Sequence, residues 1–580
     1  MADQHPQGPI VRGIDYKSTF PFTQIFRSFR AAVHPSKLIL ALVAMLLIYL
    51  GGSILDAIWP GRGAVPGEIE LYADSRDQAD PAGAFARARD QARKSAEEAY
   101  RARLIAAVYH HRTRATTQPV APVSAEEAER EGSFSMVRRH LLHQRDDAVK
   151  RAREAYDAEV KRLDEVFKAV PDEPREAKRR AADARDEALR EARNDRDDAI
   201  RAAYRAAYRQ YVESKQVRGA GLYETFVAHQ IGQVNAVIGA VRDGRWLGRG
   251  GVIDSIVAFF TIGPVWAMRH HPIFFTLFFL LFLSVWAVFG GAIARISAVH
   301  IARDEKISIR QALRFSTAKF LSFLSAPIIP LVIVLGVGLV VSVGGLLANV
   351  PFVGPIVVGA LFFLALVAGF VMTLVMLGLA GGFNLMYPTI AVEGSDSFDA
   401  ISRSFSYLYA RPWRLAFYTG VALLYGGLTY MFIRYFLELL LMLTHFFAGL
   451  LVLGQADSGN PNWSMLWPGP VQTGRLAYSP EYFSMGLGTS IGAFFIWVWT
   501  QLLAGLLGAF AISFYFVANT VIYFLMRKEV DATELDDVYL EQGDEDFVDA
   551  LPPATVPATA TAGGASSHAS GESPAGQQPA

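Results

Sequence analysis

Two ionisable residues inside an apolar run have the clearest potential for chemistry in this sequence. Arg434 and Glu438 stand four residues apart in MFIRYFLELLLML, so a helix places them on one face within reach of a salt bridge. Ionisable groups inside a bilayer are costly and usually face a partner or water, which makes this pair a candidate intramembrane charge site for transport. The alternative stays open, because the helix from Arg414 to Arg434 covers about 30 Å and would place Arg434 at the far headgroups.

No catalytic, metal-binding or cofactor-binding motif accompanies this pair. The sequence contains no HExxH, no Walker loop, no GxSxG and no strand-linked GxGxxG. It contains no cysteine, which excludes thiolate nucleophiles and Cys-type zinc or iron–sulfur sites. The pairs His110–His111 and His270–His271 are adjacent, and neighbouring helix positions diverge by about 100°, so we interpret them as solvent or interface histidines. We therefore predict no catalytic residue, no cofactor, no metal and no enzymatic activity.

The elements that would position such a site are membrane-spanning helices. Residues 271–527 contain several apolar runs, each long enough to cover a hydrocarbon core of about 30 Å. Backbone groups in a bilayer must be satisfied within the segment, so these runs are expected to be helices, five spans in all. An earlier apolar run, 38–59, follows the long basic leader 1–37 and lacks a cleavage site, which predicts an uncleaved signal-anchor helix. The sequence thus predicts an all-α polytopic membrane helix bundle of about six spans in a lipid bilayer.

Residues 60–218 have a different composition and predict a long helical arm. Ala, Arg and Glu dominate, and Pro171 and Pro174 separate two helical runs, which favours an antiparallel hairpin or coiled coil. Apolar residues in the first run step by three and four. This seam comprises Val149, Ala152, Tyr156, Val160, Leu163, Phe167 and Val170. Because basic residues alternate with acidic ones, we expect a protein partner for the arm and no nucleic acid.

Lys and Arg near the spans predict the orientation. The leader and the loops following the second and fourth spans are basic, which places both termini in the cytoplasm of a multi-pass cell-membrane protein and the arm outside. We expect residues 219–270 to form interfacial helices, with an additional span at 251–268 as the alternative. The tail, 528–580, is acidic and then of low complexity, and we expect it to be disordered.

Two apolar stretches are too long for single perpendicular spans. Residues 415–453 and 483–526 each correspond to roughly 60 Å of helix, twice the hydrocarbon core. No Pro or polar cluster marks a turn within them, so we predict long, bent helices. Splitting each in two would give eight spans instead.

The membrane region contains an internal repeat of one pattern. A short polar turn, an amphipathic helix and a basic residue follow both the second and the fourth span. In the first copy Ser308 and Gln311 form a capping box. The residues predicted to share one helix face are Ile309, Ala312, Leu313, Ser316 and Phe320 in the first copy, and Phe398, Ile401, Phe405 and Leu408 in the second. We interpret this pattern as an internal duplication.

The second copy carries a short motif, Ala391-Val-Glu-Gly394, then Phe398-Asp-Ala-Ile-Ser-Arg-Ser404 and a basic–Trp entry to the next span. In these residues the chain resembles the membrane domain attached to some glycerophosphodiester phosphodiesterases and related bacterial proteins of unknown function. The resemblance covers residues 272–526 at most and implies an integral membrane module without a known catalytic role. The phosphodiesterase barrel is absent from the sequence, and the arm departs from the family pattern.

Two hypotheses for function follow. The first is a non-enzymatic envelope scaffold that displays the arm to a protein partner. The alternative is a transporter or lipid-handling permease built on the duplicated unit, although the two copies share one orientation rather than being inverted. The sequence predicts no particular oligomeric state.

Overall fold

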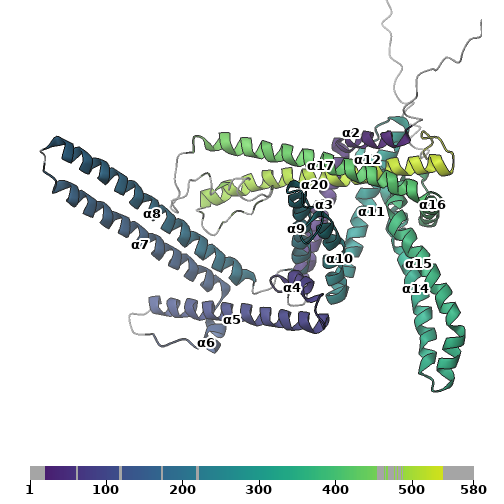
Figure 1. The fold of residues 1–580 in the computed structure, drawn as a ribbon, viewed down its shortest axis with the longest axis horizontal. Coiled ribbons are helices and arrows are strands. Elements are labelled where there is room, and N and C mark those ends of the chain that lie inside the picture. Colours follow the sequence, from purple (N-terminus) through teal and green to yellow (C-terminus); the bar gives the residue numbers. More distant parts are fainter. Residues whose placement is uncertain are drawn as a thin grey trace, which may run out of the picture. The chain divides into compact units, whose positions relative to one another are not determined.

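The computed structural model describes residues 20–59, 63–115, 120–171, 174–216, 221–452 and 487–539, together with isolated positions between 463 and 485. Every regular element in these residues is a helix (Figure 1). The residues of the leader before Phe20 and those of the tail after Tyr539 lie outside this description.

Seven helices of the described chain are long and apolar enough to cross a membrane. They are α3 (Pro35–Ile58), α10 (Val252–His270), α11 (Pro272–Arg303), α14 (Ile328–Gly345) with its 3₁₀ extension η2 (Leu346–Asn349), α15 (Val353–Glu393), α17 (Pro412–Gly449) and α20 (Leu487–Val530). The prediction of an all-α polytopic membrane bundle is therefore confirmed, and this is an integral membrane protein.

Among the described helices, α10 is the one candidate beyond the six predicted spans. The sequence predicts an interfacial helix there, with a span as the alternative. It packs antiparallel on α9 (Leu222–Arg242), and a Cβ added at Gly263 of α10 would contact Gln230 and His229 of α9. By length and composition α10 fits the alternative.

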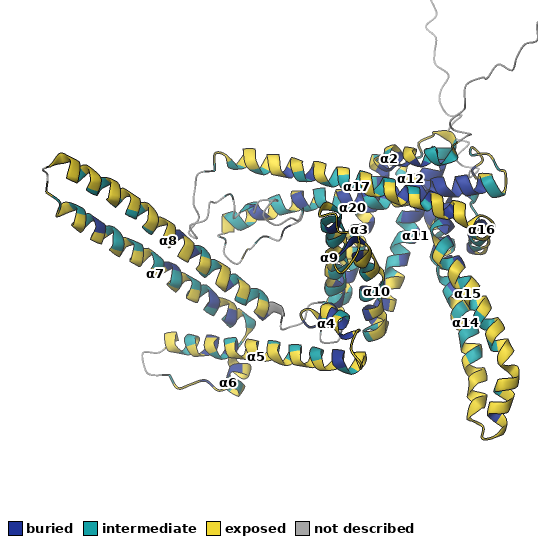
Figure 2. Cartoon of the chain, viewed as in Figure 1, coloured by how far each residue is buried: buried dark blue, intermediate teal, exposed yellow. Residues whose placement is uncertain are grey.

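Helix α20 contributes the central element of the membrane bundle. Its C-terminal half is buried almost without interruption from Ala509 to Arg527, by contacts with α3, α11, α15 and α17 (Figure 2). Small residues make this close approach possible: a Cβ at Gly290 of α11 would lie 2.5 Å from the Phe516 ring. Both α17 and α20 are continuous helices, of 38 and 44 residues.

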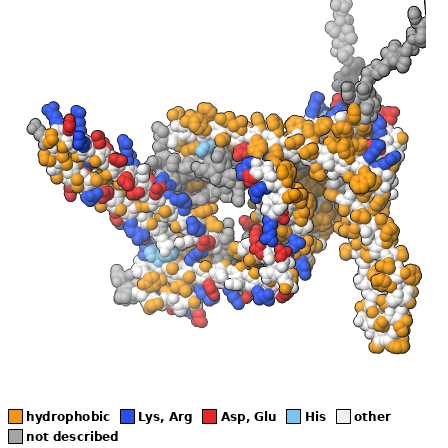
Figure 3. All heavy atoms as spheres, in the orientation of Figure 1, with side chains coloured by type: hydrophobic (Ala, Val, Ile, Leu, Met, Phe, Trp, Pro, Cys, Tyr) orange, Lys and Arg blue, Asp and Glu red, His pale blue; other side chains and the backbone are white. Residues whose placement is uncertain are grey.

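The α14–α15 pair exposes apolar side chains over most of its length (Figure 3). None of the most apolar 18-residue window in either helix is buried inside the protein. Since water would make such a surface very unfavourable, these faces contact lipid.

The arm consists of α5 (Pro81–Ala115), α6 (Ala125–Glu131), α7 (Phe134–Lys168) and α8 (Arg175–Gln216). Helices α7 and α8 form the predicted hairpin, with Val149 and Leu163 of the seam buried and mixed charges on the surface (Figure 3). Arginines hold the two helices together through aromatic rings and carboxylates. Arg145 lies over Tyr204, Arg196 over Tyr156, and Arg185 pairs with Asp164 at 2.6 Å.

Two short helices follow α11 and α15 in the same way, α12 (Ile309–Ala318) and α16 (Ser397–Ala410). The spans end in left-handed residues, Asp304 and Gly394, and side chains cap the next helices. Ser308 accepts from the Gln311 N–H at 3.2 Å, as the capping box predicts.

The buried residues of α12 and α16 occupy equivalent positions, counted from the cap of each helix. In α16 they differ from the apolar face that the sequence predicts. Ala312 and Ser316 of α12 are fully buried, and so are Ala400 and Ser404 at the same distances after their cap. Of the second apolar set, Ile401, Phe405 and Leu408 are partly buried, whereas Phe398 is 68% exposed. The reason is that a small-residue face packs closely on the bundle, which leaves the larger Phe398 side chain outside.

The remaining described helices are η1 (Pro21–Phe26), α2 (Arg27–Ala32), α4 (Glu68–Ser75) and α13 (Phe320–Ser325). The first two belong to the leader and pack on α17 and α20, whereas α4 joins the arm to the bundle.

Candidate functional site

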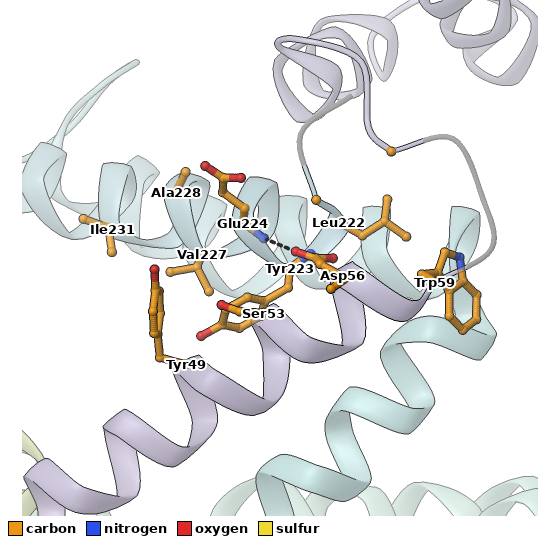
Figure 4. A pocket seen from close by; sticks show the side chains of 13 residues that line it. Tyr49, Ser53, Asp56, Trp59, Leu222, Tyr223, Glu224, Val227, Ala228 and Ile231 are labelled. Carbon is orange, nitrogen blue, oxygen red and sulfur yellow. Dashed lines mark hydrogen bonds between the residues drawn. The ribbon is translucent and has the colours of Figure 1, made fainter. Parts of the chain in front are cut away.

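The chain leaves the membrane bundle for the arm and returns to it at one place. The Asp56 carboxylate, in the last turn of α3, accepts hydrogen bonds from the N–H groups of Tyr223 at 2.9 Å and Glu224 at 3.1 Å, in the first turn of α9 (Figure 4). These N–H groups have no partner within their own helix, so a carboxylate is well placed there by both hydrogen bonding and the helix dipole. Asp56 therefore joins the point where the chain leaves the bundle for the arm to the point where it returns.

Glycines bring α3 and α9 close enough for this contact. A Cβ at Gly52 would lie 2.5 Å from the Tyr223 ring, and one at Gly221 would collide with the Asp56 carboxylate. Beside the contact, a pocket of about 610 Å³ lies between the two helices. Tyr49, Ser53 and Glu224 add polar groups to its wall, as Figure 4 shows.

A buried carboxylate connects the arm to the bundle. Glu68 at the start of α4 has no exposed surface, and its Oε2 accepts from the Val65 N–H at 2.8 Å. Its Oε1 forms an ion pair with Arg89 of α5 at 3.4 Å and a hydrogen bond with the His271 ring at 3.5 Å. Burial alone would raise the pKa of Glu68, but the hydrogen bonds from His271 and Val65 and the Arg89 charge hold it below its usual value.

Aromatic rings pack on His271, the partner of this carboxylate, and on the neighbouring His270. His270 packs on Tyr72 and Phe85, with ring centroids 5.4 and 4.6 Å apart, and His271 packs on Trp266 at 5.1 Å. We call these residues together the arm root: Asp56, Glu68, Tyr72, Phe85, Trp266, His270 and His271. His270 and His271 are half-buried, because rings of α4 and α5 pack against the end of α10.

The arm contains a histidine cluster that adjacency in sequence did not reveal. The rings of His140 and His143 lie 5.0 and 5.8 Å from that of His110, and Arg114 lies 3.0 Å from His143. His111 is not the ring partner of His110. The spacing of His140 and His143, three residues apart in α7, is the signal that could have indicated one face.

These histidines carry an electrostatic signature but no metal-site geometry. Burial, followed by the Arg114 charge, lowers the pKa of His110, and burial followed by His110 lowers the pKa of His140. Among the described residues no group of three or more His, Asp or Glu side chains is arranged to hold a metal ion.

The predicted charge site lies midway along α17. Arg434 and Glu438 are both partly buried, and no ion pair within 4.0 Å joins them in the described chain. The structure brings together a different set of charges, at the ends of α15, α16, α17 and α20. Arg527, with its side chain 6% exposed, lies 2.9 Å from Glu393, which also accepts a hydrogen bond from Tyr523.

This second set of charges extends from the last turn of α20 over its neighbours. Arg527 also donates to the Asp537 backbone carbonyl and carboxylate, at 2.6 and 2.8 Å. Glu529 pairs with Arg414 at 2.7 Å and accepts from Tyr418. We call these residues the end network. The first residues of the acidic tail thus contribute to the bundle.

Comparison with other proteins gave no match to any family model, to any curated protein or to any solved structure. The resemblance to a phosphodiesterase-associated membrane domain remains a prediction.

Proposed function

We propose that this is a non-enzymatic protein of the cell envelope that displays the arm to a protein partner outside the cytoplasm. The observation that carries the proposal is the construction of the arm. Helices α7 and α8 pack on each other and on α5, while α4 and the arm root join α5 to the bundle. A charged hairpin held in this way presents a long surface, and among the described helices it packs mainly on α5.

The proposed orientation, with both termini cytoplasmic, has two kinds of support. Phe22 of η1 packs on Phe417 in α17 at 5.7 Å, while Arg414 of α17 pairs with Glu529 at the end of α20. Both ends of the bundle therefore meet near the start of α17. Because the loops beside these residues are rich in Lys and Arg, that side is assigned to the cytoplasm.

Helix α10 affects this orientation only if it crosses alone. Since α9 and α10 form a tight antiparallel pair, we propose that they cross together or lie at the interface together. Either arrangement leaves the number of crossings even and both termini on one side.

Proximity labelling from a tag at the α7–α8 turn tests the partner proposal in intact cells. The matched variant replaces residues 64–220 with a short Gly/Ser linker, which is feasible because Gly63 and Gly221 line the same pocket. A second variant removes only residues 150–199, beyond the buried Val149 and Ile200, and keeps the arm base. In each variant the tag is moved to the junction of the deletion, so that labelling is still possible. Loss of the labelled envelope proteins is expected in both, with the bundle still inserted. Unchanged neighbours and unchanged growth without the arm would refute the proposal.

The second candidate, a transporter or lipid-handling permease, is supported by the two matching span–cap–short-helix units. Their shared orientation weakens the analogy to inverted-repeat transporters. Stabilisation of the purified protein by a specific solute would favour this candidate over the scaffold.

A further inference from the structure

A second pocket lies inside the membrane bundle, between α11, α15 and α20. Its volume is about 440 Å³, within the range typical of small-molecule sites. Phe282, Trp286, Met386, Ile512 and Phe516 contribute to its wall, and no charged side chain lines it. At its edge Phe383 and Tyr515 are 44% and 40% exposed, so the pocket is accessible from the surface of the bundle.

One polar atom in this apolar wall lacks a partner. The Tyr387 hydroxyl is buried, and no group in the described chain hydrogen-bonds to it. The neighbouring Tyr515 hydroxyl is satisfied, since it donates to the Asn384 side-chain oxygen at 2.6 Å. A buried hydroxyl normally has a partner, so a molecule with an acceptor and an apolar body that displaces the side chains covering this oxygen would complete its hydrogen bonding.

The position of Tyr387 along α15 indicates what kind of acceptor it meets. Glu393, in the charged end network, follows six residues later, about 9 Å along the helix. The end network corresponds to the polar boundary of the bundle, and the lipid-exposed stretch of α15 lies on the other side of Tyr387. An ester carbonyl occupies this depth in a glycerolipid, just below its headgroup and above its hydrocarbon chain.

We propose that this pocket binds one acyl chain of a membrane glycerophospholipid, whose ester carbonyl accepts a hydrogen bond from the Tyr387 hydroxyl. The aromatic and aliphatic wall contacts the acyl chain. The headgroup stays outside the pocket, which agrees with the absence of charged side chains from the described residues that line it. The proposal is independent of the arm and of its partner.

Photo-crosslinking in vesicles tests the site with the full-length protein. The probe is phosphatidylethanolamine with a diazirine in one acyl chain, diluted into phosphatidylethanolamine and phosphatidylglycerol, and adducts are mapped by mass spectrometry. We expect adducts at residues 383–387 and 511–516 that resist dilution better than adducts at the exposed Leu335 and Leu339 of α14. Ala511→Phe, which fills the pocket, should reduce the pocket adducts at least fivefold and leave the α14 adducts unchanged.

Further variants separate the parts of the proposal. Leu283→Phe fills the pocket from α11 and should act like Ala511→Phe, while Leu335→Phe on the lipid-exposed face is the matched control and should change nothing. Tyr387→Phe should reduce pocket adducts of the phospholipid about two- to tenfold, the effect of one hydrogen bond. A diazirine fatty acid that labels the pocket equally well, with no effect of Tyr387→Phe, would overturn recognition of the ester. Pocket adducts that persist in both filled variants would overturn the site itself.

Discussion

The carboxylate of Asp56 accepts a hydrogen bond from the backbone N–H of Tyr223, which stands 167 positions later in the chain. This contact joins the last turn of α3 to the first turn of α9, so the arm is an insertion whose two ends are fixed side by side. The bundle on either side is thereby continuous in space although it is interrupted in sequence.

Asp56→Ala should loosen the start of α9. Loss of a helix-capping side chain costs about 1–2 kcal/mol, which corresponds to about five- to thirtyfold faster local opening. Hydrogen exchange of residues 222–226 in the intact protein measures the effect. Asp56→Asn, which keeps one acceptor, should be milder, and Ser53→Ala in the same pocket is the control. Equal exchange in Asp56→Ala and the parent protein would contradict the capping role.

The ion pair between Arg527 and Glu393 should dominate the stability of the bundle end. Without Arg527, Glu393 keeps only Arg403, at 3.7 Å, and the Tyr523 hydroxyl as partners among the described residues. Arg527→Met is therefore expected to cost up to about 3–5 kcal/mol, the loss when one partner of a buried ion pair is removed. Adding Glu393→Gln should restore part of that loss. Arg434→Gln, on a partly buried residue with no ion pair in the described chain, should change stability by about 0.5 kcal/mol or less. Urea unfolding in mixed micelles can compare the variants, and equal losses for Arg527 and Arg434 would contradict the prediction.

The histidine cluster should make the α5–α7 contact sensitive to acid. The folded-state pKa of His110 and His140 lies below the ordinary 6.5, so the unfolded chain binds more protons between the two values. The contribution is complete above about pH 6.5 and is lost as the pH falls toward the folded-state pKa. The protection factors of α5 and α7, which are corrected for the pH dependence of intrinsic hydrogen exchange, should therefore fall as the pH is lowered from 7.5 to 5.5. The double variant His110→Gln and His140→Gln should lose most of this dependence; an undiminished dependence would assign it to other groups.

Thiol labelling can determine the topology, because the chain has no cysteine of its own. Ala155→Cys in the arm should react with an impermeant reagent from outside, and Ser402→Cys in α16 should not. Ser402 is exposed, whereas Ser404 is buried and would not report. Leu247→Cys, between α9 and α10, should label only from inside if the two helices cross and from outside if they lie at the outer interface. Labelling of Ser402→Cys from outside would reverse the proposed orientation.

Local patterns in the sequence were sufficient for the elements that depend on local physics. Apolar length indicated the spans, the spacing of Val149 and Leu163 indicated the α7 seam, and Ser308 with Gln311 indicated a capping box. Each of these signals lies within one or two helical turns, where side-chain spacing alone determines which groups can meet.

The sites depend on pairs that are remote in sequence, and no local pattern contains them. Asp56 and Tyr223 belong to different helices. In the sequence, Glu393 and Arg527 are charged residues at the ends of two spans, and nothing near either one indicates that they pair. Arg434 and Glu438 had the better local spacing, yet it is the tertiary fold that pairs Arg527 with the partly buried carboxylate of Glu393. His110 likewise meets His140 only because α5 packs on α7.

The closure by Asp56 also has a consequence for the order in which the protein is made. At about 5–20 residues per second, the ribosome needs about 8–33 s to extend the chain over the 167 positions from Asp56 to Tyr223. During that interval α3 is already synthesised, while α9, α11 and α20, against which it packs, are not. The first helix must therefore persist in the bilayer on its own hydrophobicity, and the arm has time to fold before the membrane bundle exists.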